Sequence, residues 1–154
     1  VIERLGARFD VEEYGGLDYG PDYYPLKAIR SRDWREDLPV VLITGGVHGY
    51  ETSGVHGALQ FLDQHAADYA GRVNLLVAPC VSPWAYERIH RWNPNAVDPN
   101  RSFRDDGLAD EAAALKTLGS PVTCSELPGT NHNSWDAAYA SPALTDWLFA
   151  QRRG

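Results

Sequence analysis

Residues 42–54 read Leu-Ile-Thr-Gly-Gly-Val-His-Gly-Tyr-Glu-Thr-Ser-Gly, and this stretch decides the expected fold. Residues 40–44 form a short, apolar, β-branched run, which is typical of a buried strand. Gly45 and Gly46 end that run, and the segment after them has apolar residues at helical spacing. His48 and Glu51 are therefore expected on the loop between the carboxyl end of a strand and a helix. In open α/β sheets, ligands bind at this position.

The His48 and Glu51 pair has two interpretations. An imidazole and a carboxylate three positions apart can point at one metal ion, and their nitrogen and oxygen donors suit zinc. The simpler interpretation is a surface histidine at the start of a capped helix, and the spacing alone favours it. A second stretch of the chain decides between them.

Residues 93–103 read Asn-Pro-Asn-Ala-Val-Asp-Pro-Asn-Arg-Ser-Phe. Together the two stretches resemble the zinc carboxypeptidase family and its relatives, the aspartoacylase and succinylglutamate desuccinylase group. That family has Gly-Gly-x-His-x-x-Glu between a strand and a helix, followed later by a Gly-x-Asp-x-Asn-Arg-x-Phe-like segment. Ala96 stands here in place of the glycine of the second motif. The resemblance covers residues 24–118.

The resemblance implies a zinc-dependent hydrolase that cleaves an amide bond next to a free carboxylate. His48 and Glu51 would be two of its three metal ligands. Arg91 matches the family arginine that stabilises the oxyanion, and Asn100 and Arg101 would hold the substrate carboxylate. The implied substrate is a small peptide or an N-acyl amino acid.

Other basic residues have simpler expectations. Arg88 is the weaker candidate for the oxyanion role. His56, His65 and His90 are expected on the surface or in packing. Taken by itself, Arg101 could also be an ordinary solvated charge on a loop.

The chain departs from the family where the third metal ligand is expected. The family has a histidine at the end of the strand after the helix that we expect at residues 109–118. Residues 121–132 instead read Pro-Val-Thr-Cys-Ser-Glu-Leu-Pro-Gly-Thr-Asn-His. On one interpretation His132 completes the metal site, and Glu126 is the general base because its strand context resembles that of the family's base.

On the other interpretation, residues 126–153 resemble the C-terminal end of α/β-hydrolase esterases, in which a histidine such as His132 is the triad base. The chain contains no Gly-x-Ser-x-Gly nucleophile elbow. It then reads as a carboxypeptidase-like front joined near residues 119–121 to an esterase-like tail. A fusion, a deletion or a minimal relative each fit this pattern. A binding-only remnant without a complete zinc site also remains open.

The pattern of elements predicts an α/β fold with a mainly parallel or mixed sheet flanked by helices. The resemblance makes it a truncated carboxypeptidase-like fold in a single domain of residues 1–154. Residues 1–22 could be a leading strand or a mobile arm, and residues 40–44 are expected at the centre of the sheet. The expected strands are residues 24–31, 40–44, 72–80 and 121–127. The expected helices are residues 52–67, 83–91, 109–118, 136–140 and 142–152.

Composition excludes several classes of partner. The chain has 154 residues and a net charge of −7, which argues against nucleic acid and anionic membranes. It has no apolar run of about 18 residues, so no membrane span is expected. The first residues lack a signal-peptide pattern, and Cys80 and Cys124 are expected to be buried free thiols. These features predict a cytoplasmic protein.

Overall fold

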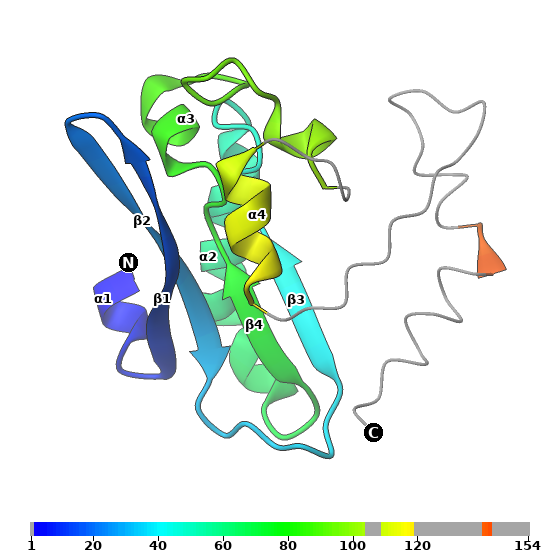
Figure 1. Cartoon of the computed structure of the whole chain (residues 1–154). Helices are drawn as coiled ribbons and strands as arrows, with labels where there is room; N and C mark the ends of the chain where they lie inside the picture. Colours follow the sequence, from blue (N-terminus) through cyan, green and yellow to red (C-terminus); the bar gives the residue numbers. More distant parts are fainter. Residues whose placement is uncertain (1, 104–108, 119–139, 143–154) are drawn as a thin grey trace.

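The computed structural model describes residues 2–103, 109–118 and 140–142. In this part of the chain, a four-stranded mixed sheet has the order β1-β2-β4-β3 (Figure 1). β1 and β2 pair antiparallel, β2 and β4 pair antiparallel, and β4 and β3 pair parallel. The α/β class with a mixed sheet is therefore confirmed. The strands are β1 (Phe9–Tyr19), β2 (Asp22–Ser31), β3 (Val40–Thr44) and β4 (Asn74–Ala78).

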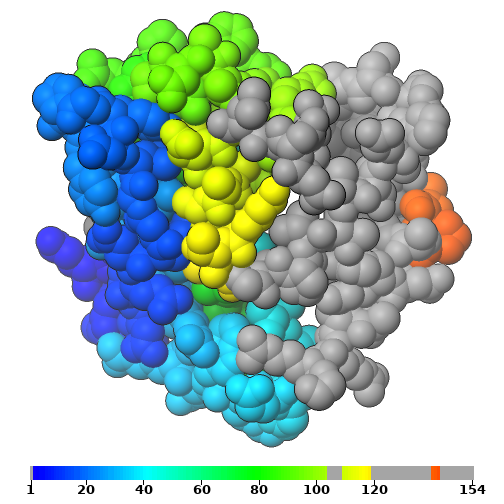
Figure 2. All heavy atoms as spheres, viewed as in Figure 1, coloured from blue at the N-terminus to red at the C-terminus, as the bar shows by residue number. Residues whose placement is uncertain are grey.

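Helices cover both faces of this sheet. α2 lies behind it and α4 lies in front, while α3 is near the upper end in Figure 1. Figure 2 shows α4 on the front face beside β1 and below the segment that carries α3. No helix in the described ranges is long and apolar enough to cross a membrane. The helices are α1 (Ile2–Leu5), α2 (Thr52–Gln64), α3 (Pro83–Arg88) and α4 (Asp110–Lys116), with 3₁₀ turns η1 (Ala66–Tyr69) and η2 (Pro99–Arg101).

Alternating side chains of β4 build a core on each side of the sheet. Leu75 and Val77 pack with Leu62 of α2 in the larger cluster. Ala78, at the end of β4, packs instead with Leu115 of α4. Burying a side chain such as Leu62 stabilises the fold by about 1.5–3 kcal/mol. The two clusters fix the sheet between α2 and α4, and with it the loops at the carboxyl ends of β3 and β4.

Two details differ from the expectations for the strands. β3 has the expected bounds, but the expectation that it is central is wrong for the described residues, where it ends the strand order. β4 is the strand that is buried along its whole length, because it lies between β2 and β3 and its two faces pack into the clusters with α2 and α4. The ambiguous residues 1–22 contain β1, which forms a hairpin with β2.

Several expected features lie outside the described residues. These are the strand at residues 121–127, most of the two C-terminal helices, Cys124 and the junction near residues 119–121. Of the two cysteines, Cys80 is free and half-buried. Burial raises the pKa of its thiol to about 11, so this thiol is neutral near pH 7.

Candidate metal and substrate site

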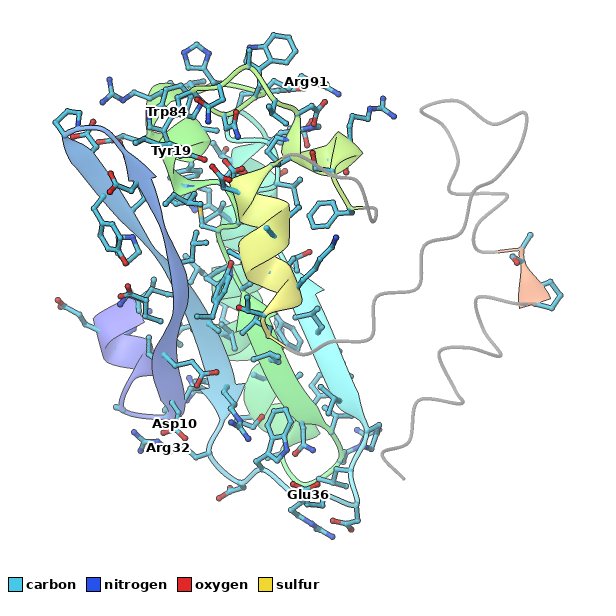
Figure 3. The ribbon with its side chains drawn as sticks, in the orientation of Figure 1. Asp10, Tyr19, Arg32, Glu36, Trp84 and Arg91 are labelled. Carbon is cyan, nitrogen blue, oxygen red and sulfur yellow. The ribbon has the colours of Figure 1, made fainter. Side chains whose placement is uncertain are left out.

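The candidate site forms where the chain leaves β3 and β4 at one edge of the sheet. Because these strands are parallel, both of their carboxyl ends reach this edge. The backbone N–H of Gly45 donates to the Ala78 carbonyl at 3.0 Å, and the N–H of Val81 donates to the Gly45 carbonyl at 2.9 Å. Figure 3 places Arg91 at this upper end and Asp10 and Arg32 at the opposite end of the molecule.

Two glycines determine the path of the loop that carries His48. Gly46 has φ 61°, in the left-handed region that side chains disfavour. A Cβ on Gly49 would lie 1.9 Å from the backbone carbon of Ala85 in α3, so only glycine fits there. The loop is therefore packed directly against α3, and the side chain of His48 is held in a buried position, 5% exposed.

His48 lies between two carboxylates. Its Nδ1 is 3.1 Å from Glu51 Oε1, and its Nε2 is 2.9 Å from Asp98 Oδ1. A neutral imidazole carries one N–H and can donate to only one of them. If Nδ1 and Glu51 held a metal ion, the Nε2–H would donate to Asp98. Metal-binding histidines commonly donate their other ring N–H to a carboxylate in this way.

The distance between the two donors also fits zinc. Nitrogen and oxygen ligands lie about 2.0–2.2 Å from zinc, so at a tetrahedral angle they are roughly 3.3 Å apart. The observed separation of His48 Nδ1 and Glu51 Oε1 is 3.1 Å. Within residues 2–103, 109–118 and 140–142, no group of three His, Cys, Asp or Glu side chains could hold a metal ion. His132 and Glu126 lie outside these residues, so the third ligand and the general base stay predictions.

Asp98 joins the histidine to the candidate oxyanion arginine. Arg91 Nε donates to Asp98 Oδ2 at 3.1 Å, while Asp98 Oδ1 faces His48. Burial opposes ionisation of Asp98, but the hydrogen bonds from His48 and Arg91 outweigh it and lower the pKa of this carboxyl. Asp98 is therefore an anion that orients both side chains. Asp98 lies in the Asp-x-Asn-Arg motif, but the motif alone does not show that it contacts His48 and Arg91.

Asn100 and Arg101 lie on η2, the turn that begins after Asp98. The backbone N–H of Asn100 donates to Asp98 Oδ1 at 3.0 Å, which ties this turn to the histidine's partner. Both side chains are exposed, and neither forms a side-chain hydrogen bond among the residues that the structure describes. Their amide and guanidinium groups are thus exposed on a turn whose first residues are tied to Asp98.

Tyr50 is a further member of the site that the sequence analysis missed. Its ring is parallel to the imidazole of His48, with an interplanar angle of 5° and a centroid separation of 5.9 Å. Its hydroxyl oxygen accepts a hydrogen bond from Arg91 Nη1 at 3.1 Å. Its place between His48 and Glu51 in the sequence was the only signal that could have found it.

The remaining basic candidates lie elsewhere. Arg88 pairs with Asp22 at the start of β2, so Arg91 is the arginine that reaches the site. His56, His65 and His90 are exposed, as expected. His90 stacks on Trp84, with ring centroids 5.5 Å apart.

A buried carboxyl supports the loop between Arg91 and Asp98. Glu111 of α4 is fully buried and accepts hydrogen bonds from the Tyr19 hydroxyl at 3.1 Å and from Asn93 Nδ2 at 3.2 Å. The other side-chain atom of Asn93, Oδ1, accepts from the backbone N–H groups of Asn95 and Val97. The loop is therefore anchored to the sheet and to α4 through this carboxyl.

The same loop explains the glycine of the family motif. Ala96 has φ 58°, in the left-handed region. Glycine adopts this conformation without a steric penalty, whereas another residue is strained by about 1–2 kcal/mol. The anchored loop keeps this shape with alanine.

Replacing Glu111 with alanine should lower the free energy of unfolding by about 2–4 kcal/mol, because it leaves the buried amide of Asn93 and the half-buried hydroxyl of Tyr19 without their acceptor. Chemical denaturation measures this loss. Glu111→Gln is the control that keeps the volume and removes the charge.

Burial raises the pKa of Glu111 above its ordinary 4.5, so its stabilising contribution is complete below that pH and is lost as the pH rises through the folded-state pKa. The wild-type protein should therefore lose stability relative to Glu111→Gln as the pH rises; equal pH profiles would contradict this assignment.

Comparison with known proteins identifies one family that this chain matches. Residues 37–128 match the family model described as the succinylglutamate desuccinylase/aspartoacylase catalytic domain. This match includes the stretch that contains Glu126. A search of curated proteins found no match.

Three similar solved structures show how much of the fold is shared. A candidate metallopeptidase from Shewanella baltica OS155 has 30% identity and a TM-score of 0.64, over 77% of this chain and 46% of that chain. A candidate metallopeptidase from Shewanella denitrificans OS217 has 32% identity and a TM-score of 0.61, over 74% and 41%. An aspartoacylase family protein from Mesorhizobium loti MAFF303099 has 25% identity and a TM-score of 0.57, over 71% and 36%. The chain thus spans less than half the length of each of these proteins.

Proposed function

Because the chain belongs to the succinylglutamate desuccinylase/aspartoacylase catalytic domain family, we propose that it is a zinc-dependent hydrolase of the metallocarboxypeptidase type. The proposed reaction is cleavage of an amide bond next to a free carboxylate. One observation carries this proposal: His48 has Glu51 on one ring nitrogen and Asp98 on the other. That arrangement supports a metal-binding imidazole better than a surface histidine, because the side chain is also buried.

The residues divide into ligands and groups that act on the substrate. His48, Glu51 and His132 would hold zinc, and Asp98 keeps the His48 ring in orientation. A bound zinc ion would polarise the scissile carbonyl and make a water molecule more acidic. Glu126 would take the proton from that water. The guanidinium of Arg91, beside the metal ligands, would donate hydrogen bonds to the oxyanion.

The substrate class follows from η2. Asn100 and Arg101 present an amide and a planar guanidinium, and the guanidinium fork matches a carboxylate with two parallel hydrogen bonds. The family description names succinylglutamate, which is an N-acyl amino acid. We therefore propose an N-acyl amino acid or a small peptide with a free carboxylate as the substrate.

The test uses an N-acyl amino acid and its amide, in which the free carboxylate is blocked. With zinc, the protein should hydrolyse the acid, and Arg101→Ala should weaken binding of the acid by about ten- to a hundred-fold, the value of a charge-assisted hydrogen bond of roughly 1.5–3 kcal/mol. Binding of the amide should change little. Calorimetry measures binding of the acid and of the amide, and initial rates measure hydrolysis.

Arg72→Ala is the matched control for this substitution. Arg72 is an exposed arginine against Tyr69, just before β4 and away from the carboxyl edge of the sheet. The Arg72→Ala variant should bind the acid and the amide as tightly as the wild-type protein does. Equal losses for the acid and the amide in Arg101→Ala would show that Arg101 is not the carboxylate anchor. Binding of the acid without any hydrolysis would favour a binding-only remnant.

A further inference from the structure

Four side chains at the site form a ring of contacts, in which each side chain contacts the next and the last contacts the first. His48 Nε2 faces Asp98 Oδ1, Asp98 Oδ2 accepts from Arg91 Nε, and Arg91 Nη1 donates to the Tyr50 hydroxyl. The ring of Tyr50 then lies parallel to that of His48. These residues come from the loop after β3 and from the chain after α3.

Tyr50 makes three contacts with the protein although its side chain is at the surface. Its side chain is at the surface, and the residue is 42% exposed. A tyrosine hydroxyl in such a position can bond to water instead of protein. Here the backbone N–H of Tyr50 donates to the His90 carbonyl at 3.2 Å, the ring stacks on His48 and the hydroxyl accepts from Arg91. Three contacts with three different residues fix both the position and the direction of the hydroxyl.

The guanidinium of Arg91 is consequently held at two points. Asp98 holds Nε and Tyr50 holds Nη1, whereas Nη2 has no hydrogen-bond partner in the part of the chain that the structure describes. If Arg91 were held only through Nε, its planar guanidinium could still pivot about that one hydrogen bond. The second contact selects one orientation and leaves Nη2 able to donate to an anionic ligand.

We infer that Tyr50 is a positioning residue, whose hydroxyl orients the Arg91 guanidinium toward the oxyanion that forms beside His48 and Glu51. The inference rests on the proposed function, because the oxyanion belongs to that reaction. A positioned donor stabilises charge that develops in the transition state, so its loss lowers kcat and leaves KM unchanged. Tyr50 does not itself need to touch the substrate.

Tyr50→Phe tests the inference, since it removes the hydroxyl and keeps the ring on His48. We expect kcat to fall about ten-fold at unchanged KM and zinc content, the lower end of the value of a hydrogen bond to a charged group. Tyr69→Phe is the control: Tyr69 packs on Phe61 in the η1 region, and its variant should behave as wild type. Tyr50→Ala, which also removes the ring from His48, should weaken zinc binding as well.

A second measurement does not need activity. Nitrogen NMR of the metal-free protein, with the Arg91 side chain assigned through Arg91→Lys, reports rotation of the guanidinium. Rotation should be restricted in wild type and faster in Tyr50→Phe. Equal rotation in both proteins would overturn the inference, and so would a change in KM alone, which would place Tyr50 in contact with the substrate. Absence of zinc and hydrolysis in wild type would count against the proposed function, while the NMR comparison would still decide whether Tyr50 orients Arg91.

Discussion

Replacing Asp98 with alanine is expected to lower kcat/KM by about 10³-fold or more. The reason is that one carboxylate serves two side chains: Oδ1 lies 2.9 Å from His48 Nε2, and Oδ2 lies 3.1 Å from Arg91 Nε. Loss of the partner of a metal-binding histidine costs about 10–100-fold in metal affinity or activity. Loss of one oxyanion donor costs about 10²–10³-fold.

Two measurements separate these contributions. Competition with a chelator gives the zinc affinity, and initial rates at saturating zinc give the effect on Arg91 alone. Asp98→Asn keeps the size and one acceptor oxygen, so it should fall between wild type and Asp98→Ala. Asp63→Ala is the control, because Asp63 pairs with Arg4 at α1 and should affect neither quantity. Unchanged zinc affinity in Asp98→Ala would mean that His48 is not oriented by this carboxylate.

Asp98 also accepts the backbone N–H of Asn100, so some loss of stability is expected in the same variant. Loss of such a cap typically costs about 0.5–2 kcal/mol. Thermal denaturation of Asp98→Ala and Asp98→Asn measures this cost directly. Rates are then compared at a temperature at which both variants are folded.

Replacing His132 with alanine should remove most of the bound zinc, while the purified wild-type protein should hold about one zinc ion. A catalytic zinc takes three protein ligands, and in the proposed site His48 and Glu51 would supply only two. In the sequence, five residues separate Glu126 from His132. Five residues can span up to about 16 Å when extended, so His132 can either return to the metal or lie well away from it, and this variant decides between the two. Metal analysis of the purified proteins measures the loss, and circular dichroism checks that the variant is folded.

His65→Ala is the matched control for this experiment, because His65 is an exposed histidine at the end of α2. It should keep its zinc, and His48→Ala should lose it. Zinc retained in His132→Ala would place the third ligand elsewhere and favour the esterase-like interpretation of the tail. A wild-type protein without zinc would instead favour a binding-only remnant.

The sequence by itself determined the local elements of the site. The β-branched run followed by two glycines gave β3 its observed bounds, Val40–Thr44, and placed His48 and Glu51 on the loop before α2. The helix expected at residues 109–118 is α4, Asp110–Lys116. These patterns succeed because strand and helix periodicity, and the turn preference of glycine, act between residues that are close in the chain.

Only the tertiary structure decided which side chains meet. Asp98 is 50 residues from His48, and Arg91 is 41 residues from Tyr50. No periodicity relates positions so far apart. Their contact depends on the parallel pairing of β3 with β4, on the close approach of Gly49 to α3 and on the Glu111 anchor of the Asn93 loop. The same reason explains why β3 ends the strand order among the described residues although it is apolar: its residues require burial, but the pairing of strands decides which strand is central.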